Sequence, residues 1–534
     1  MPNQNLMDAI EAWKKAIGDH AVRLPVVAEN ELCTFSADQA LLARLQPTDI
    51  HGVSQCLQIA TEFRVPLYPI STGHNWGYGS AVPTVSAVLL DLSRLNQITD
   101  YDPVLGTVSV QPGVTQQQLY AYLQQQGGHF WMDATGSSGA CSVLGNTLER
   151  GFGHSPYSDH AGQLVRMEVM LADGRLIQTG LGHFGTAKAA DYYAAGIGPG
   201  LSQLFLQSNF GVVTQITINL MPAPEYFQAV YFSIAQPDGI GRLVDALQPL
   251  RLQGVLRSAL HIGNGYRVLS SIQQYPWAAA GGVTPLPERV LQDFAKQWDF
   301  GAWNGSAALY GTRRQVAESR RMIKSALGRQ VKKLRFMDDD ALALAKRIQK
   351  PYRWLTGVNL PELLKLIEPV HHMMKGQPTD RIIASTYWRK KMAIPAAMDP
   401  DRDRCGLIWC AHVAPTKGAF AKEMTDIAYQ IVLAHGFEPG MTLTLINERC
   451  LDNVVSISYD RDVPGEDQRA LACYAELTQA LIAAGYFPYR LGTHAMQLMQ
   501  QYAGQDYLHL LAQLKRVFDP QYIISPGRYI GREA

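Results

Sequence analysis

The segment Ser71-Thr72-Gly73-His74-Asn75-Trp76-Gly77-Tyr78-Gly79 decides the fold of this chain. It follows Leu67 to Ile70, a short apolar run that predicts a buried strand. Three glycines in one turn after a strand indicate backbone that folds closely around a ligand, and exposed N–H groups suit a pyrophosphate. The spacing is not G-x-G-x-x-G and no helical pattern follows, so a Rossmann site is a poor match. Taken alone, the glycines are explained equally well by a tight structural turn.

The composition is that of a large globular protein. Its 534 residues favour two domains over a single core. Hydrophobic residues make up 47% of the chain and charged residues 17%, which is enough apolar surface to fill large cores. With 47 basic and 46 acidic residues the net charge is +1, so the charge balance predicts no binding of nucleic acid or of an anionic membrane.

Three local features of the sequence indicate where the protein is located and whether it binds a metal. Seven scattered cysteines, an odd number, argue against a disulfide framework. Residues 1–22 predict an amphipathic helix whose charges argue against a secretory signal, and no apolar run reaches the length of a membrane span. Asp338-Asp339-Asp340 predicts a helix start, because no further ligand cluster accompanies it. We expect a cytoplasmic protein without a metal; export after folding remains the alternative.

The N-terminal part alternates helical and strand patterns. Apolar residues share one helical face over 53–63, and Pro66 ends that helix. Ala172-Asp173-Gly174 predicts a hairpin between two strands, and Pro222 and Pro224 predict a boundary after a third. The predicted strands lie over 86–92, 108–110, 164–171, 176–179, 211–220 and 229–234, and the further helices over 115–126, 243–252 and 313–334.

A second segment, Cys141 to His160, crowds polar, glycine and aromatic residues together without helical or strand periodicity. Its pattern predicts a long loop, and long loops of this kind tend to be functional. We therefore expect it to contribute to the same site as the glycine-rich loop.

With both segments in view, the chain resembles the vanillyl-alcohol oxidase / p-cresol methylhydroxylase flavoproteins. The matching segments follow the order of that family and span nearly the whole chain: Gly73–Gly79, Gly145–His160, Glu168–Gly174, Gln207–Thr214, Tyr489-Arg490 and Asp519–Arg528. The resemblance implies a two-domain α+β fold of the p-cresol methylhydroxylase (PCMH) type. An FAD-binding domain would cover residues 1–225 and an antiparallel-sheet cap domain residues 226–490. The segment 491–534 would return to the FAD domain.

The resemblance also assigns residues to the cofactor. FAD would lie on the two glycine-rich segments, and His160 would contact the flavin or order its loop. The residues expected to bind it are Ser71, Thr72, Gly73, His74, Asn75, Trp76, Gly77, Gly79, Cys141, Ser142, Gly145, Asn146, Gly151, His160, Val213 and Arg528.

A phenol site is the next implication of the resemblance. In the family, two tyrosines and an arginine bind a phenol as phenolate, and Tyr78, Tyr489 and Arg490 match those positions. Arginine stays cationic and forks onto an oxyanion, while each tyrosine donates one hydrogen bond. A phenolate pushes electrons toward its para carbon, which helps a hydride leave the benzylic position for flavin N5. His154 stands where relatives often have tyrosine, so we expect it to line the cavity and to exchange protons.

Two positions depart from the family pattern. The aspartate that oxidase members carry near flavin N5 falls near Ser137, and Asp133 is the only carboxylate close by. The cap residue that often bonds the flavin 8α carbon falls on Leu407, which cannot form that bond, and the nearby His412 aligns elsewhere. The acid/base step and the attachment of the flavin therefore need other residues.

His74 and Cys141 offer another attachment. They resemble the histidine that bonds the 8α carbon and the cysteine that bonds C6 in berberine-bridge-enzyme-like relatives. Both positions lie on one edge of the flavin ring, and a thiolate is the required nucleophile. We predict covalent FAD through His74, with Cys141 as a second link. A packing histidine and a buried free thiol are the alternatives.

The preferred function is an FAD oxidase or dehydrogenase that takes a hydride from a para-substituted phenol or related aromatic alcohol. One alternative is an oxidase of a sugar, an alcohol or a natural-product intermediate, which the His74/Cys141 pair would suit. Another is a flavin-binding protein with little catalysis. The expected partners are a small-molecule substrate, O2 or a redox protein as electron acceptor, and a second copy in a homodimer.

Overall fold

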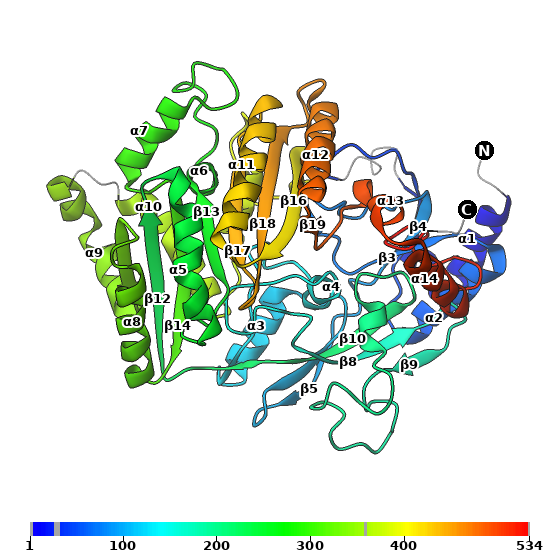
Figure 1. Ribbon diagram of the computed structural model, residues 1–534. Helices are drawn as coiled ribbons and strands as arrows, with labels where there is room; N and C mark the ends of the chain where they lie inside the picture. Colours follow the sequence, from blue (N-terminus) through cyan, green and yellow to red (C-terminus); the bar gives the residue numbers. More distant parts are fainter. Residues whose placement is uncertain (1–3, 26–32, 357–359, 532–534) are drawn as a thin grey trace.

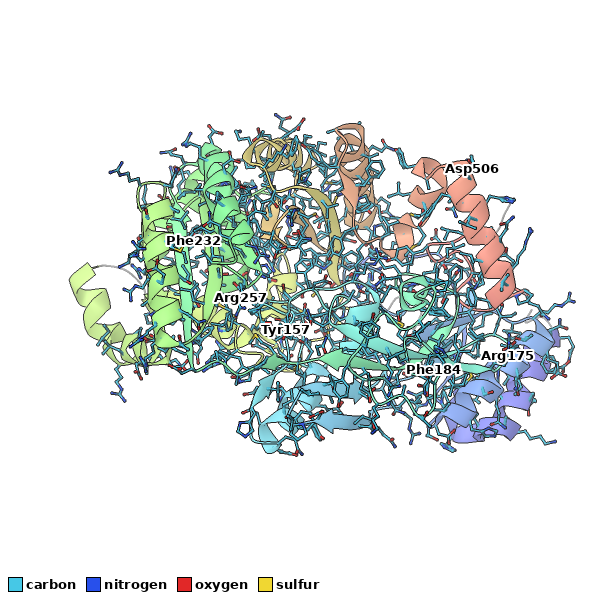
Figure 2. All side chains as sticks on the ribbon, turned by 60° about the horizontal axis from the view of Figure 1, so that its bottom comes forward. Tyr157, Arg175, Phe184, Phe232, Arg257 and Asp506 are labelled. Atoms are coloured by element: carbon cyan, nitrogen blue, oxygen red, sulfur yellow. The ribbon has the colours of Figure 1, made fainter. Side chains whose placement is uncertain are left out.

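The computed structural model describes residues 4–25, 33–356 and 360–531. They form an α+β protein in which small sheets lie beside one large sheet that helices cover on one face (Figure 1). In Figure 2, Phe232 of the large sheet and Asp506 of the C-terminal segment lie toward opposite ends of the molecule. No helix in these described ranges is long and apolar enough to cross a membrane.

A four-stranded sheet carries the glycine-rich loop. Its order is β1 (Val22–Arg23), β2 (Leu41–Leu45), β4 (Ala87–Asp91) and β3 (Leu67–Ile70), with β2 and β3 parallel to β4. Helices α1 (Gln4–Ile17) and α2 (Ile50–Phe63) pack on each other beside it. The helix predicted over 53–63 and the strand over 67–70 are confirmed. Residues 1–3 of the predicted N-terminal helix lie outside the described ranges.

The second sheet is antiparallel. Its five strands are β5 (Ile98–Asp102), β6 (Thr107–Val110), β10 (Val212–Asn219), β8 (Leu164–Met170) and β9 (Leu176–Gln178), in that order. The predicted hairpin is confirmed, since Val169 pairs with Ile177. Helix α3 (Gln116–Gln125) begins at a capping box on Thr115, and β7 (Phe130–Trp131) pairs with β11 (Met221–Pro222).

The third sheet is the large one, and it forms the cap side of the molecule. Its order is β15 (Lys333–Met337), β12 (Tyr226–Ile234), β14 (Trp303–Gly311), β13 (Leu260–Asn264), β17 (Gly440–Leu445), β18 (Cys450–Asp460), β16 (Cys405–Pro415) and β19 (Phe487–Pro488). Every pairing in it is antiparallel. The strand predicted over 229–234 is confirmed within β12.

Helices cover the outer face of this sheet. In Figure 1 they run side by side in the order α8 (Arg313–Leu327), α5 (Ile240–Leu252), α11 (Gly418–Ala434) and α12 (Glu466–Ala483). The other helices of this part are α6 (Gly265–Ile272), α7 (Glu288–Trp298), α9 (Asp339–Thr356) and α10 (Leu360–Met373). Asp338 accepts a hydrogen bond from the N–H of Ala341 at 2.9 Å and starts α9, as expected for a helix cap.

The helix predicted over 313–334 is too long. α8 ends at Leu327, and Lys333 already belongs to β15. Strand β15 pairs along β12, with Phe336 opposite Val230, so sheet pairing overrides the helical propensity of the basic residues.

The C-terminal segment returns to the first sheet through α13 (Leu498–Tyr502) and α14 (Gln505–Phe518). Leu67 of β3 donates to the carbonyl of Ile523 at 2.8 Å and accepts from Ser525 at 2.8 Å. The ammonium of Lys515 is fully buried, 2.7 Å from the Asp519 carboxylate, and also donates to the carbonyls of Asn209 and Ile524. This one side chain therefore ties the C-terminal segment to the N-terminal part.

We expect Lys515→Met to lower the free energy of unfolding by about 3 to 5 kcal/mol, because it leaves the buried carboxylate of Asp519 without its cation. Urea denaturation followed by tryptophan fluorescence measures the change. The matched control is Lys296→Met at an exposed position of α7. Equal midpoints for the two variants would contradict the role of Lys515.

Candidate functional site

A cavity of about 520 Å³ lies between the N-terminal part and the large sheet. One wall comes from the loop after β3, from the short helix α4 (Val143–Leu148), from β10 and from the C-terminal segment. The opposite wall comes from the inner face of the large sheet, from α6 and from α10. Of the predicted site residues, those that line it are Ser71, Thr72, Gly73, His74, Asn75, Trp76, Tyr78, Cys141, Ser142, Gly145, Asn146, Gly151, His154, Val213, Tyr489, Arg490 and Arg528.

The glycine-rich loop presents free backbone donors to this cavity. The N–H groups from Thr72 to Asn75 form no hydrogen bond with any residue of the described ranges. Gly77 has a φ of 78°, and a Cβ there would collide with the indole of Trp409. Gly79, with a φ of 117°, is packed as tightly against Thr493. Unpaired N–H groups on a constrained loop fit the pyrophosphate of a dinucleotide.

The wall beside this loop is helical, which the sequence pattern did not predict. The segment 141–160, expected as a long loop, contains α4, whose first turn is capped by the Ser142 hydroxyl, which accepts from the N–H of Gly145 at 2.9 Å. Six residues are too few to show a helical period. A Cβ on Gly145 would lie 3.0 Å from the Ser71 hydroxyl, so a glycine lets α4 approach the loop.

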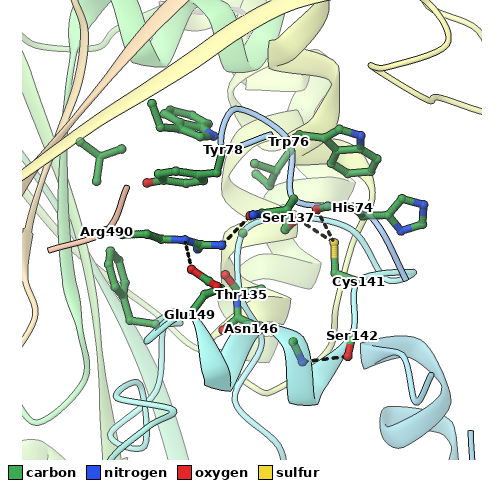
Figure 3. A pocket seen from close by; sticks show the side chains of 18 of the residues that line it. His74, Trp76, Tyr78, Thr135, Ser137, Cys141, Ser142, Asn146, Glu149 and Arg490 are labelled. Carbon is green, nitrogen blue, oxygen red and sulfur yellow. Dashed lines mark hydrogen bonds and ion pairs between the residues drawn. The ribbon is translucent and has the colours of Figure 1, made fainter. Parts of the chain in front are cut away.

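A buried carboxylate, Glu149, holds two arginines at the centre of the site. Its Oε1 pairs with Arg528, and its Oε2 accepts from the Tyr529 hydroxyl at 2.8 Å. Arg490 Nε lies 3.4 Å from Oε2, an ion pair that Figure 3 shows. Burial opposes ionisation of Glu149, but the two arginines outweigh it and lower its pKa. Sequence reasoning missed Glu149, because its partners lie more than 300 residues away and no local motif contains them.

The three residues expected at a phenol lie together. The guanidinium carbon of Arg490 is 4.2 Å from the centre of the Tyr78 ring, and Arg490 donates to Asn75 at 2.5 Å. Burial raises the pKa of Tyr78 to about 12 and that of Tyr489 well above its usual value. Both hydroxyls therefore stay protonated at neutral pH and can donate hydrogen bonds, beside a permanent positive charge.

Two histidines whose rings contact each other at a tilt also line the cavity. The rings of His154 and His261 are 4.4 Å apart, and burial lowers the pKa of both, to about 3 for His261. His154 Nδ1 lies 3.0 Å from the carbonyl of Ala134, which can only accept, so this nitrogen carries the proton. Nε2 of His154 then holds a lone pair, and the ring suits a proton acceptor better than a donor. His261 carried no motif that would have marked it.

Asp133 and His160 lie behind the wall rather than in it. The Asp133 carboxylate is 2.8 Å from His160 Nε2 and accepts from the N–H groups of His154 and Ser155 at 3.1 and 2.6 Å. Burial opposes its ionisation, yet the hydrogen bonds from His160 and Ser155 lower its pKa. Neither side chain is among those that line the cavity in the described ranges. The pair positions the loop that carries His154.

The residues proposed for covalent attachment are neighbours. The Cys141 thiol lies 2.9 Å from the Ser137 hydroxyl and 3.8 Å from the carbonyl oxygen of His74, and burial raises its pKa. Figure 3 shows His74 and Cys141 on the side of the cavity away from Arg490. Leu407 lies in the same apolar cluster as Cys141, buried beneath the loop. No group of three or more metal-ligating side chains occurs in the part of the chain described.

Comparisons with known proteins agree with this site. Two family models match: "FAD binding domain" over residues 42–180 and "FAD linked oxidases, C-terminal domain" over 453–529. The chain is 40% identical over 533 residues to the 1'-carboxy-chondrochloren decarboxylase of Chondromyces crocatus, covering 99% of this chain and 98% of that one.

Two solved structures are similar along their whole length. Substrate-bound p-cresol methylhydroxylase superposes with a TM-score of 0.88 at 27% identity, over 99% of this chain and 98% of that one. The isoeugenol complex of 4-ethylphenol oxidase from Gulosibacter chungangensis gives 0.90 at 25% identity, over 100% and 98%. The fold is thus the two-domain PCMH type, and its cofactor is FAD. The chain belongs to the vanillyl-alcohol oxidase / p-cresol methylhydroxylase family of FAD-dependent oxidoreductases.

Proposed function

We propose that this enzyme oxidises a para-substituted phenol at its benzylic carbon. The observation that carries the proposal is the convergence of Tyr78, Tyr489 and Arg490 in one buried cavity. The names of the relatives p-cresol methylhydroxylase and 4-ethylphenol oxidase support the same substrate class.

The proposed roles follow from the charge of each group. The hydroxyls of Tyr78 and Tyr489 donate to the phenol oxygen, and Arg490 stabilises that oxygen as an anion. The phenolate then raises electron density at the para position, where the hydride leaves. FAD, when bound, supplies the two-electron acceptor. Because the position of the family's aspartate falls near Ser137, which has no carboxylate, the lone pair on His154 Nε2 is the proposed acceptor of the phenol proton.

We expect Tyr489→Phe to slow anaerobic flavin reduction by 4-ethylphenol about 10²- to 10³-fold, because one donor to the developing charge is lost. Stopped-flow absorbance of the flavin measures this rate. Tyr502→Phe, at an exposed position of α13, is the matched control and should behave as wild type. Equal rates for the two variants would rule out a phenolate contact by Tyr489.

A covalent bond between the flavin and His74, with Cys141 as a second link, is also part of the proposal. The proposal is supported by the position of His74 and Cys141, which both line the cavity and are neighbours, with the thiol 3.8 Å from the backbone carbonyl of His74. We expect the intact mass of the holoenzyme to exceed that of the bare chain by one FAD. The added mass should disappear in His74→Ala if His74 forms the single bond, and only in the double variant His74→Ala/Cys141→Ala if Cys141 forms a second one. If Cys141 is a second link, Cys141→Ala should keep the added mass of FAD, because His74 still holds it, but should change the visible spectrum, because the bond to C6 is lost. Acid precipitation that releases all the flavin from wild type would refute the bond.

Oxidative decarboxylation is a second candidate, which the name of the 40%-identical relative favours. Hydride loss from the benzylic carbon converts the phenolate to a p-quinone methide. If the next carbon bears a carboxylate, its C–C bond breaks and CO2 leaves. The electron pair of that bond forms the side-chain double bond, and the ring regains its phenolate. The hydride loss is the only oxidation, so no further oxidant is needed.

The two candidates differ in their products. For 3-(4-hydroxyphenyl)propanoate labelled with ¹³C in the carboxylate, decarboxylation yields labelled CO2 and 4-vinylphenol in amounts equal to the flavin reduced anaerobically. Simple oxidation yields a product that keeps the label. Mass spectrometry of the headspace and of the reaction mixture distinguishes them.

A further inference from the structure

A third arginine, Arg267, lines the cavity from the cap side. It lies in the first turn of α6, directly after β13, where the Asn264 side chain accepts from its N–H at 3.0 Å. Its side chain passes over Gly263, where an added Cβ would lie 3.5 Å from Arg267 Cγ. Gly263 and Arg267 both belong to the wall of the cavity.

Arg267 has no counter-ion among the described residues. The one hydrogen-bond partner of its guanidinium there is the Ser385 hydroxyl, at 3.1 Å from Nη1, and the guanidinium carbon lies 5.7 Å from the centre of the Trp409 ring. Burial lowers the pKa of Arg267 to about 10, so it is still a cation at neutral pH. Since a guanidinium has five N–H donors, most of its donors remain for a group inside the cavity.

Arg267 is partly exposed to the cavity, whereas the buried arginines Arg389 and Arg251 have protein partners. Arg389 pairs with Glu438 at 3.0 Å and lies 3.5 Å from Glu466. Arg251 lacks a carboxylate in the described ranges, but it donates to the carbonyls of Leu256, Ser258 and Ile446. A buried charge without such partners carries a large desolvation cost. An anionic ligand would offset that cost at Arg267.

We propose that Arg267 binds a carboxylate on the side chain of the substrate, a proposal that rests on the phenol-oxidising function. The planar fork of a guanidinium matches a carboxylate, and burial excludes competing water. Trp409 links the two ends of the site, because its ring packs on Gly77 beside Tyr78 and also lies near Arg267.

The helix α10, which packs against α6, gives the cavity an apolar lining. Residues of α10 line it with aliphatic and thioether side chains, namely Leu366, Ile367, Val370 and Met373. The substrate class is therefore a 4-hydroxyphenyl compound whose side chain carries a carboxylate and tolerates an apolar extension.

The test compares two ligands that differ only in charge, 3-(4-hydroxyphenyl)propanoate and its primary amide. Their dissociation constants for the holoenzyme are measured anaerobically by the change in the flavin spectrum on mixing, before reduction. We expect wild type to bind the carboxylate at least 10-fold more tightly than the amide. Arg267→Gln should lose this preference because it binds the carboxylate ligand more weakly, while its affinity for the amide stays the same. Arg267→Lys should keep part of the preference.

The matched control is Arg257→Gln, at an exposed position labelled in Figure 2, which should preserve the preference. If wild type binds both ligands equally and 4-ethylphenol still reduces the flavin, the inference about Arg267 is wrong and the phenol function stands. If no phenol binds or reduces the flavin, both are overturned. Since the wild-type preference needs no variant, poor folding of Arg267→Gln would not obscure the result.

Discussion

The site depends on one buried carboxylate that is shared by two arginines. Glu149 follows α4, whereas Arg490 lies just past the last strand of the large sheet and Arg528 near the end of the chain. None of the three charges is tolerable in the interior alone, so folding has to bring them together. Two cations on one anion leave a net positive charge, and these residues line the same cavity as the loop with its unpaired N–H groups. The same contact that joins the domains therefore prepares the cavity for anions.

The buried histidines and tyrosines around the phenol site add no negative charge to the cavity. Burial keeps His154 and His261 neutral and keeps Tyr78 and Tyr489 protonated, so none of them opposes the arginines. Asp133, the carboxylate that the sequence placed nearest to the site, already binds His160 and backbone N–H donors outside the cavity. An anionic substrate thus meets cations and neutral donors at both ends, with Arg267 at the cap side.

Features set by neighbouring residues could be predicted from the sequence, whereas features set by residues far apart in the chain could not. The loop at 71–79 and the strand before it are local features, and their glycines and apolar run carry the prediction. Tyr489 and Arg490 could be found only through the ordered resemblance, because nothing in their surroundings marks them. Glu149 and Arg267 were missed since their roles come from residues that approach only after folding. Helix α4 was not predicted because it is too short to show a helical period. The boundary between α8 and β15 was not predicted because the pairing of β15 with β12 determines it.

The return of the C-terminal segment to β3 has a consequence for biosynthesis. Leu67 receives its last neighbours, Ile523 and Ser525, only after the ribosome has made the whole cap, and Lys515 and Arg528 arrive at the same late stage. Until then the N-terminal sheets have an incomplete dinucleotide seat and Glu149 lacks both arginines. The complete cofactor seat therefore forms only after Arg528 has been synthesised, late in the production of the chain.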